Sequence, residues 1–308
     1  MSWRAGVANL PLARIFSDQE LPVSLLPDSW IFTAHCPSKL GTVDVVTRYM
    51  AESGHYINEI HSFDDRVSQR FFIRVAFSPA AQFSPPVFRE HFTPRVAPFE
   101  MQWQLTPPLH RERTAIMVSK FDHCLNDLLF RHRTGQLNID VPLIISNHPD
   151  LSSLAEWHGI PYYHLPVNND TRPEQEARIL ALLEQYQIDL VVLARYMQVL
   201  SPMICEKLAG KAINIHHSLL PGFKGARPYH QAWEKGVKMV GATAHYVNND
   251  LDEGPIITQG IQSVDHALYP DDLISRGQDI ERVTLFNAVR YHVEKRVFLS
   301  GKRTVILS

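Results

Sequence analysis

The amino-acid sequence predicts an α/β protein made of two units. Residues 29–106 read as strand, helix, two strands, a second helix and a last strand, which is a βαββαβ order. From residue 114 onward, apolar strands alternate with amphipathic helices, as in a Rossmann-like, mostly parallel, doubly wound sheet. The 308 residues are 45% apolar and 20% charged, an ordinary globular composition with enough length for two domains.

The smaller unit is predicted from alternating apolar residues and from its turns. "HYINEIHSF" and "QRFFIRVAF" alternate as half-buried strands do, and the helical stretch "TVDVVTRYMAESG" closes at Gly54. A proline-rich segment at 79–98 allows only a short second helix. The expected elements are a strand at 29–35, a helix at 42–54, strands at 55–63 and 69–77, the short helix, and a strand at 101–105.

The larger unit is predicted from strands that are apolar throughout, which is typical of strands buried on both faces. The expected parallel strands lie at 114–119, 141–147, 161–167, 188–194 and 211–216, with helices at 122–135, up to 157, and at 173–187. Two further strands are expected at 240–247 and 255–261. A long helix at 271–298 and an edge strand at 303–307 complete this unit.

These elements divide the chain into four parts: a loosely packed tail at 1–28, the smaller unit at 29–106, a linker at 107–113 and the larger unit at 114–308. The tail lacks the serine richness of a transit peptide and the long apolar region of a secretory signal. We therefore expect no targeting segment.

Composition excludes several classes of partner. A net charge of −2 gives no basic surface for nucleic acid, and no apolar run is long enough to cross a membrane. Cys36, Cys124 and Cys205 form no CxxC pair, which predicts a reducing, cytoplasmic setting and no structural zinc. No HExxH spacing appears, so we expect no metal. The loop "VSKFDHC" after the first parallel strand lacks GxGxxG and GxxxxGK[ST], which argues against a dinucleotide or nucleoside triphosphate.

The strand "KAINIH" ends in hydrogen-bonding side chains. Asn214 and His216 are two residues apart, so their side chains share one face, whereas His217 points the other way or lies in the turn. An amide can donate to a developing oxyanion, and a neighbouring imidazole can act as a general acid or as its electrostatic partner. A carboxylate to orient the imidazole could come from Asp250, Asp252 or Glu253; of these, Asp252 precedes the Gly-Pro turn.

Each of these residues also has a purely structural interpretation. Asn214 could form a turn, His216 and His217 could begin a loop, and Asp252 could be one of several solvated acids. Together, on a parallel sheet without a nucleotide loop, they favour acyl-group chemistry without a metal.

Two stretches carry a resemblance to a known family. "NIHHSLLPGFKGARPYHQA" and "VGATAHYVNNDLDEGPIITQ" resemble the folate-dependent formyltransferases, over about residues 112–300. Relatives that transfer formyl to an amine typically read Asn-Ile-His-Pro-Ser-Leu-Leu-Pro, and this chain has His217 in place of the proline. The doubled histidine, "GARPYHQA" and "SKFDHCLNDLL" are similar to the hydrolytic branch of the family.

The resemblance implies a reaction and a set of site residues. The reaction is 10-formyltetrahydrofolate plus water giving formate and tetrahydrofolate, with formate feeding purine synthesis; folate is the substrate and no separate cofactor is implied. The catalytic residues carried over are Asn214, His216 and Asp252, supported by His245 and His217. The residues carried over to folate binding are Met197, Gln198, Val199, Leu200, Asn248 and Asn249. Without the resemblance, the stretch at 197–200 reads equally as a strand-to-helix loop with a buried apolar run.

The first third resembles an ACT domain, the βαββαβ module that often binds amino-acid effectors and joins subunits. This implies a regulatory unit, an amino-acid effector and a homo-oligomer. "HCPSKLG" has Ser38 where the module usually has aspartate. This difference does not affect the expected fold, but the motif that usually accompanies effector binding is not intact.

Three other functions compete with hydrolysis. An amine transformylase would need a glycine-rich phosphate loop where this chain has "VSKFDHC". A methionyl-tRNA formyltransferase would need a basic RNA-binding extension after the catalytic unit, and the near-neutral charge gives none. A non-catalytic amino-acid sensor would not need Asn214, His216 and Asp252 together.

Overall fold

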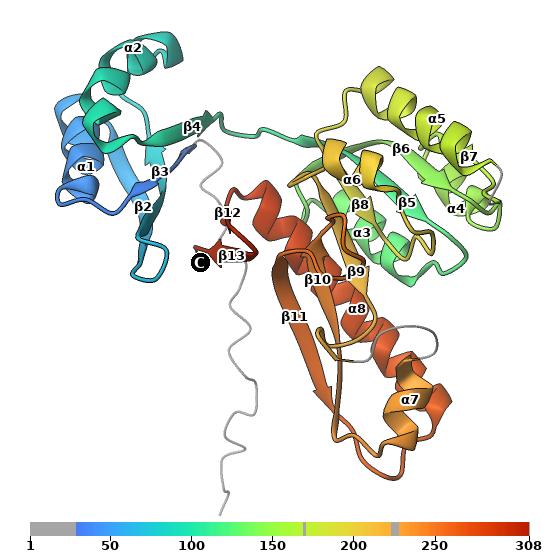
Figure 1. The fold of residues 1–308 in the computed structure, drawn as a ribbon. Helices are drawn as coiled ribbons and strands as arrows, with labels where there is room; N and C mark the ends of the chain where they lie inside the picture. Colours follow the sequence, from blue (N-terminus) through green and yellow to red (C-terminus); the bar gives the residue numbers. More distant parts are fainter. Residues whose placement is uncertain (1–28, 169–170, 223–227, 308) are drawn as a thin grey trace, which may run out of the picture.

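The computed structural model describes residues 29–168, 171–222 and 228–307. Within them the chain forms a small unit and a large unit joined by an extended connection (Figure 1). The expected tail at 1–28 lies outside the described residues. No helix in the described part of the chain has both the length and the apolar character needed to cross a bilayer.

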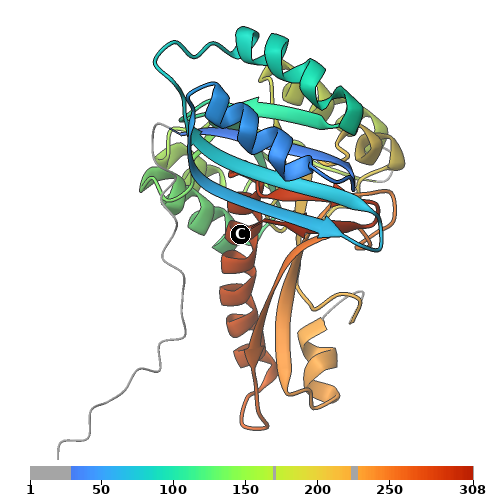
Figure 2. The ribbon, with the colours of Figure 1, turned by 90° about the vertical axis from the view of Figure 1, so that its left-hand side faces the viewer.

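The small unit is an antiparallel sheet with the strand order β2-β3-β1-β4, as expected for an ACT-like βαββαβ fold. Its strands are β1 (Trp30–Pro37), β2 (Tyr56–Asp65), β3 (Arg70–Ser78) and β4 (Gln102–Thr106). Helices α1 (Thr42–Glu52) and α2 (Pro85–Val96) pack on one face (Figure 2), and a 3₁₀ turn, η1 (Ala97–Phe99), follows α2. The second helix is longer than predicted because two prolines fit its first turn and Pro94 falls only in its last turn.

The large unit is a seven-stranded sheet with the order β11-β10-β9-β8-β5-β6-β7. Its strands are β5 (Glu112–Val118), β6 (Ile139–Ser146), β7 (Tyr162–His164), β8 (Leu190–Leu193), β9 (Ala212–His216), β10 (Met239–Tyr246) and β11 (Ile256–Ser263). The first five run parallel, while β10 is antiparallel to both β9 and β11. The predicted mostly parallel sheet is confirmed.

Helices cover both faces of the large sheet (Figure 1). They are α3 (His123–Arg133), α4 (Ser152–Trp157), α5 (Arg172–Gln185), α6 (Pro202–Lys207), α7 (Pro228–Glu234) and α8 (Pro270–Val293). Successive residues of β5 enter opposite cores: Ile116 packs in the layer that contains α3 and α8, and Met117 in the layer that contains α5. Helices α6 and α7 were not predicted, because each is shorter than two turns and shows little periodicity.

The prediction for the C-terminal part was wrong in two respects. The last helix does not extend to residue 298: it ends at Val293, and Lys295 takes a left-handed conformation with φ 58°. The strand β13 (Arg303–Ile306) is not an edge of the large sheet, since it pairs with β12 (Val297–Ser300) in a separate hairpin. Residues 297 and 298, which were predicted to be the end of the helix, belong instead to the first strand of this hairpin.

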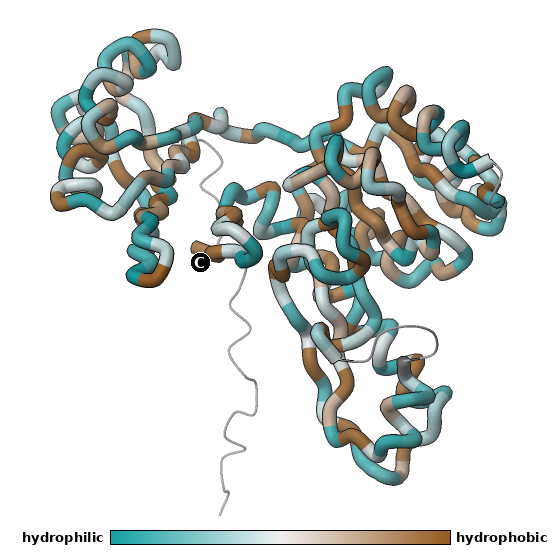
Figure 3. Tube along the Cα trace, in the orientation of Figure 1, coloured by the Kyte–Doolittle hydropathy of each residue, from teal (hydrophilic) through white to brown (hydrophobic). Residues whose placement is uncertain are grey.

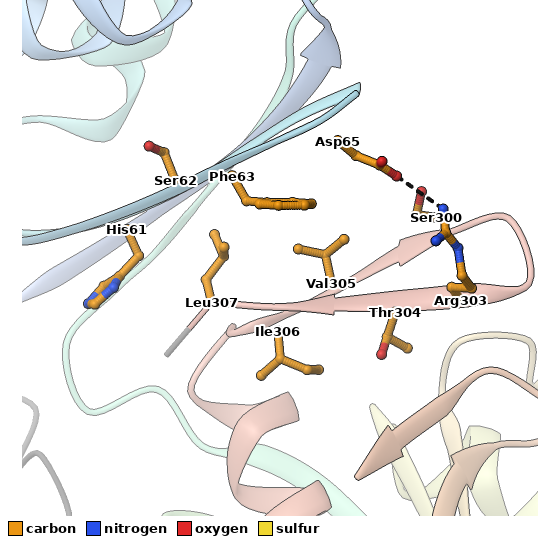
Figure 4. Close-up of a pocket in the computed structure, with 10 residues that line it drawn as sticks. All are labelled: His61, Ser62, Phe63, Asp65, Ser300, Arg303, Thr304, Val305, Ile306 and Leu307. Atoms are coloured by element: carbon orange, nitrogen blue, oxygen red, sulfur yellow. Dashed lines mark hydrogen bonds and ion pairs between the residues drawn. The ribbon is translucent and has the colours of Figure 1, made fainter. Parts of the chain in front are cut away.

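This hairpin connects the two units. Phe298 packs against Phe72 of the small sheet with ring centroids 5.6 Å apart, and Arg74 donates from Nε to the carbonyl oxygen of Glu294 at 3.0 Å. A cavity of about 500 Å³ lies beside this contact and holds none of the predicted catalytic residues. Figure 4 shows Phe63 of β2 on one side of it and the C-terminal hairpin on the other.

Candidate active site

The carboxyl end of β9 holds two of the predicted catalytic side chains on one face. The register of β9 with β10 places His245 opposite Asn214 and Thr243 opposite His216. Side chains that face each other across two antiparallel strands lie within contact distance. Pairing with β10 therefore adds His245 and Thr243 to the polar groups that the alternation of β9 predicts.

Asn214 is oriented by its neighbour on β10. His245 has Nδ1 2.8 Å from the backbone carbonyl oxygen of Tyr246, which can only accept, so this nitrogen carries the proton. The other ring nitrogen, Nε2, then accepts from the Asn214 amide nitrogen at 3.3 Å. Burial lowers the pKa of His245, which keeps the ring neutral. One amide hydrogen of Asn214 is thereby engaged, and the second is left for another acceptor.

His216 lies between a carboxylate and a hydroxyl. Its Nδ1 is 3.2 Å from Asp252 Oδ2, and its Nε2 is 2.9 Å from Ser218 Oγ. Since the carboxylate accepts, Nδ1 donates to Asp252, and Nε2 then accepts from the Ser218 hydroxyl. Sequence reasoning missed Ser218, although its place two residues after His216 in a strand-end turn was a local signal.

Asp252 reaches the cluster because of an unusual turn. Its backbone has φ 58°, and Gly254 follows where an added Cβ would lie 1.7 Å from the carbonyl oxygen of Tyr246. Burial alone would raise the pKa of the Asp252 carboxyl, but the hydrogen bond and charge of His216, with a smaller contribution from His245, lower it overall. The carboxylate is ionised at neutral pH.

The turn after β9 is fixed by side chains that sequence reasoning also missed. Thr243 donates to the carbonyl oxygen of Ser218 at 2.9 Å and accepts from the backbone N–H of Leu220 at 3.0 Å. Gln259 of β11 donates to both Thr243 and the Leu220 carbonyl. These contacts hold the end of β9 in place without adding chemistry of their own.

The cluster opens into a cavity of about 270 Å³. Asn214, His216, His217, His245 and Asp252 all line it. So do the six residues that the family resemblance assigned to folate: Met197, Gln198, Val199, Leu200, Asn248 and Asn249. This cavity is smaller than the one between the two units, but it brings the predicted polar groups together with an apolar wall.

His217 does not point away from the site. Its ring stacks on that of His216 with centroids 5.2 Å apart, and it lies 6.3 Å from the Tyr229 ring. Burial lowers the pKa of His217 to about 4, and the nearby Arg195 guanidinium adds to the effect. His217 is therefore neutral at physiological pH and can accept a hydrogen bond.

A second buried cluster lies beside His217, and sequence reasoning did not find it. Glu281 of α8 is 1% exposed; it accepts from His123 Nε2 at 2.8 Å and from the Tyr229 hydroxyl at 2.8 Å, and lies 3.4 Å from Arg195 Nε. Burial would raise the pKa of Glu281, but these three partners lower it. Glu281 sits in the middle of a helix, 86 positions after Arg195, so no local pattern pointed to it.

Three atoms of this cluster are also close enough to suggest a metal site. His123, Cys124 and Glu281 each offer one ligand atom, all within 4.8 Å of one another. The Glu281 carboxylate is, however, already engaged by hydrogen bonds and an ion pair, and burial raises the pKa of the Cys124 thiol well above its ordinary value. A protonated thiol and an engaged carboxylate fit an ion-pair network better than a metal centre.

Comparison with known proteins places this arrangement in a family. The Formyl transferase family model matches residues 112–289, which include the whole cluster. A curated relative from Corynebacterium sp. (strain P-1), a formyltetrahydrofolate deformylase, is 51% identical over 280 residues, covering 90% of this chain and 97% of its own. The chain belongs to the formyltetrahydrofolate deformylase family. A solved deformylase from Pseudomonas putida KT2440 is 61% identical, with a TM-score of 0.87 over 91% of this chain and 100% of that one.

The likeness to transformylases is narrower than the likeness to the deformylase family. A glycinamide ribonucleotide transformylase from Symbiobacterium toebii is 31% identical with a TM-score of 0.61, and it covers 65% of this chain and 95% of that one. The deformylases match across both units, whereas this transformylase matches a stretch too short to include both. The ACT-like unit is thus part of what this chain shares with the deformylase family.

Proposed function

We propose that this chain hydrolyses 10-formyltetrahydrofolate to formate and tetrahydrofolate. The observation that carries the proposal is the convergence of Asn214, His216 and Asp252 at one end of a cavity whose other walls are the residues assigned to folate. The chain's membership of the deformylase family supports the same reaction. Folate is the substrate, and the proposed chemistry uses no separate cofactor.

The proposed mechanism begins with water attacking the formyl carbon. His216 takes a proton from the water at Nε2, and the resulting imidazolium and the free amide hydrogen of Asn214 stabilise the charge on the carbonyl oxygen as it becomes an oxyanion. Asp252, held 3.2 Å from His216 Nδ1, positions the water and raises the basicity of the imidazole. A proton from the water reaches N10 as the carbon–nitrogen bond breaks, which releases formate and tetrahydrofolate.

His245 and His217 have supporting roles in this proposal. His245 fixes the orientation of the Asn214 amide through the hydrogen bond between them. His217, neutral and stacked on His216, accepts a hydrogen bond from the attacking water or holds the His216 ring in place. Met197 to Leu200, with Asn248 and Asn249, offer backbone hydrogen bonds and apolar walls to the flat pterin ring.

The test is a product assay with 10-formyltetrahydrofolate. The purified protein should release one formate per tetrahydrofolate formed, at the same rate with and without an added amine. A formylated amine as the main product would favour a transformylase instead. Absence of any turnover, with tetrahydrofolate or an amino acid still bound, would favour the sensor.

For the ACT-like unit at 29–106 we propose two functions: pairing of subunits and binding of an amino-acid effector. The outer strand β2 exposes Tyr56, Ile60 and Phe63, and an open strand edge of this kind is suited to pairing with a second copy. The cavity beside the C-terminal hairpin is lined by Asp65 and Arg303, which form an ion pair at 3.1 Å; a bound amino acid would pair its ammonium with Asp65 and its carboxylate with Arg303 in place of that contact (Figure 4). Formate release measured across a panel of amino acids tests the second function.

The loop residue that departs from the usual ACT pattern retains a polar role. Ser38 donates from its hydroxyl to Asp64 of β2. An aspartate at this position would place two carboxylates side by side, so in this chain Asp64 supplies the negative charge that the module usually carries at position 38. We propose that serine here preserves an acidic group beside the loop, on β2, and does not abolish effector binding.

A further inference from the structure

The large sheet has a topological switch point next to the candidate active site. The chain runs from β5 outward to β6 and β7, then returns to β8 and β9 on the other side of β5. The carboxyl ends of β5 and β8 therefore flank the place where open α/β sheets usually bind a ligand. Arg195 lies two residues after the end of β8 and lines the same cavity as Asn214 and His216.

In this chain, side chains fill the switch point. Arg195 is nine-tenths buried, and its guanidinium carbon lies 5.3 Å from the ring centroid of Phe121, which follows β5. On α8, the Glu281 carboxylate lies 3.4 Å from Arg195 Nε. The guanidinium thus stands between the loop after β5 and helix α8, beside the ring of His217.

Contacts near the ends of β5 and β8 fix the position of the Arg195 side chain in this space. Glu281 is held by His123 and the Tyr229 hydroxyl as well as by Arg195. Ser119, at the end of β5, accepts from the backbone N–H of Met197 at 2.9 Å and ties the two strand ends together. A buried ion pair is on average no more stabilising than well-packed apolar residues. Stability alone is therefore a weak reason for an arginine and a glutamate at this point.

We propose that Arg195 occupies the space through which an amine acceptor would approach the formyl carbon, so that water is the acceptor that fits. The inference rests on the proposed hydrolysis. In hydrolysis a carbon–oxygen bond forms, the carbon–N10 bond breaks and a water proton moves to N10. In transfer an amine nitrogen forms the new bond and an amine proton moves to N10. Water needs only about 30 Å³, whereas an amine brings its substituents with it.

Arg195→Gly is the decisive variant. Arg195 has φ 67°, a left-handed conformation that glycine adopts without strain, and Glu281 keeps two other hydrogen-bond partners. The variant, the wild type and the controls are each given 10-formyltetrahydrofolate with glycinamide or hydroxylamine, and formate and formylated amine are both measured. In Arg195→Gly the ratio of formylated amine to formate should rise by about tenfold or more, the discrimination expected from the shape of a pocket.

Three further variants test whether the space occupied by Arg195, and not another effect of its substitution, determines the ratio of formylated amine to formate. Gln187→Gly changes an exposed residue with φ 50° that lies outside the cavity, and it should leave the ratio unchanged. Arg195→Met keeps the volume without the charge and should still release formate alone. Phe121→Ala removes the ring against which the Arg195 guanidinium lies, so that the Arg195 side chain is free to leave the space, and it should raise the ratio even if Arg195→Gly does not fold.

Two results would overturn the inference: an unchanged ratio in folded Arg195→Gly and Phe121→Ala proteins, or amine transfer by Arg195→Met equal to that of Arg195→Gly. The second would make charge, and not occupied space, the cause. A wild type that releases no formate would refute the proposed function instead, so the two failures are distinguishable in one assay.

Discussion

Replacing Asp252 by asparagine removes one negative charge from the centre of the site and changes little else. The carboxylate lies 3.2 Å from His216 Nδ1 and 3.8 Å from His245 Nε2. Asparagine has nearly the same shape, so the turn that depends on Gly254 is preserved. The expected loss therefore falls on the chemistry and not on the fold.

The size of that loss follows from the hydrogen bonds of His216. In the wild type Nδ1 donates to Asp252 and Nε2 accepts from Ser218. An amide nitrogen facing Nδ1 would favour the other tautomer, with the proton on Nε2, and the ring would lose both its charge partner and its orientation. Loss of an oriented acid–base group costs about 1,000- to 10,000-fold in kcat, which corresponds to about 4 to 5.5 kcal/mol.

The assay is formate release at neutral pH, paired with binding of tetrahydrofolate measured by calorimetry. Tetrahydrofolate binding should stay within about threefold, because the carboxylate acts on the transition state and not on the pterin. The matched control is Glu253→Gln, which alters the neighbouring acid, an exposed residue outside the cavity lining, and should keep wild-type turnover. An Asp252→Asn protein whose kcat falls less than tenfold would refute the mechanism.

Four further outcomes are expected. His217→Pro should lower kcat by about 10- to 1,000-fold with tetrahydrofolate affinity kept, if the imidazole positions the water; equal losses in both would indicate a misfolded loop. Gly254→Ala should cost about 2 to 4 kcal/mol in urea unfolding, since its Cβ would overlap the Tyr246 carbonyl. Burial lowers the pKa of His292 to about 4, so between pH 4 and the ordinary pKa of 6.5 the unfolded chain binds more protons than the folded one. Stability measured by thermal unfolding should therefore fall as the pH drops from 6.5 to 4, and it should fall less in His292→Leu. Sedimentation should show an oligomer that Ile60→Lys weakens, and a wild-type monomer at micromolar concentration would contradict the pairing of β2 edges.

Strand periodicity was enough to find half of the candidate site. The two-residue spacing of Asn214 and His216 at the end of an apolar strand placed both on one face, and the structure agrees. Asp252 could be separated from Asp250 and Glu253 only by the family resemblance. What distinguishes it is a left-handed backbone angle and a close approach at Gly254, which depend on the return of the chain to β11 and leave only a Gly-Pro turn as a local sign.

Other features had no local sign at all. Arg195 and Glu281 belong to a loop and to the middle of a long helix, and they meet because α8 packs against β9 and β10. The C-terminal hairpin was misread as helix and edge strand since a four-residue strand gives two alternations at most. Its role also depends on a distant element, because Phe298 finds its partner, Phe72, in the other unit. Contacts of this kind are set by tertiary packing, which overrides local propensity.

Of the two clusters around His217, one supplies the catalytic groups and the other limits which acceptor can approach the formyl carbon. Asn214, His216 and Asp252 stabilise charge on the formyl group, and these groups would serve equally whether water or an amine attacks. The acceptor must in addition fit into the space beside the formyl carbon. Because water is smaller than any amine, filling the space beside the formyl carbon selects water without a new catalytic group. By this reasoning the difference between hydrolysis and transfer lies with Arg195 and Glu281, in a fold that is also found in transformylases only 31% identical to this chain.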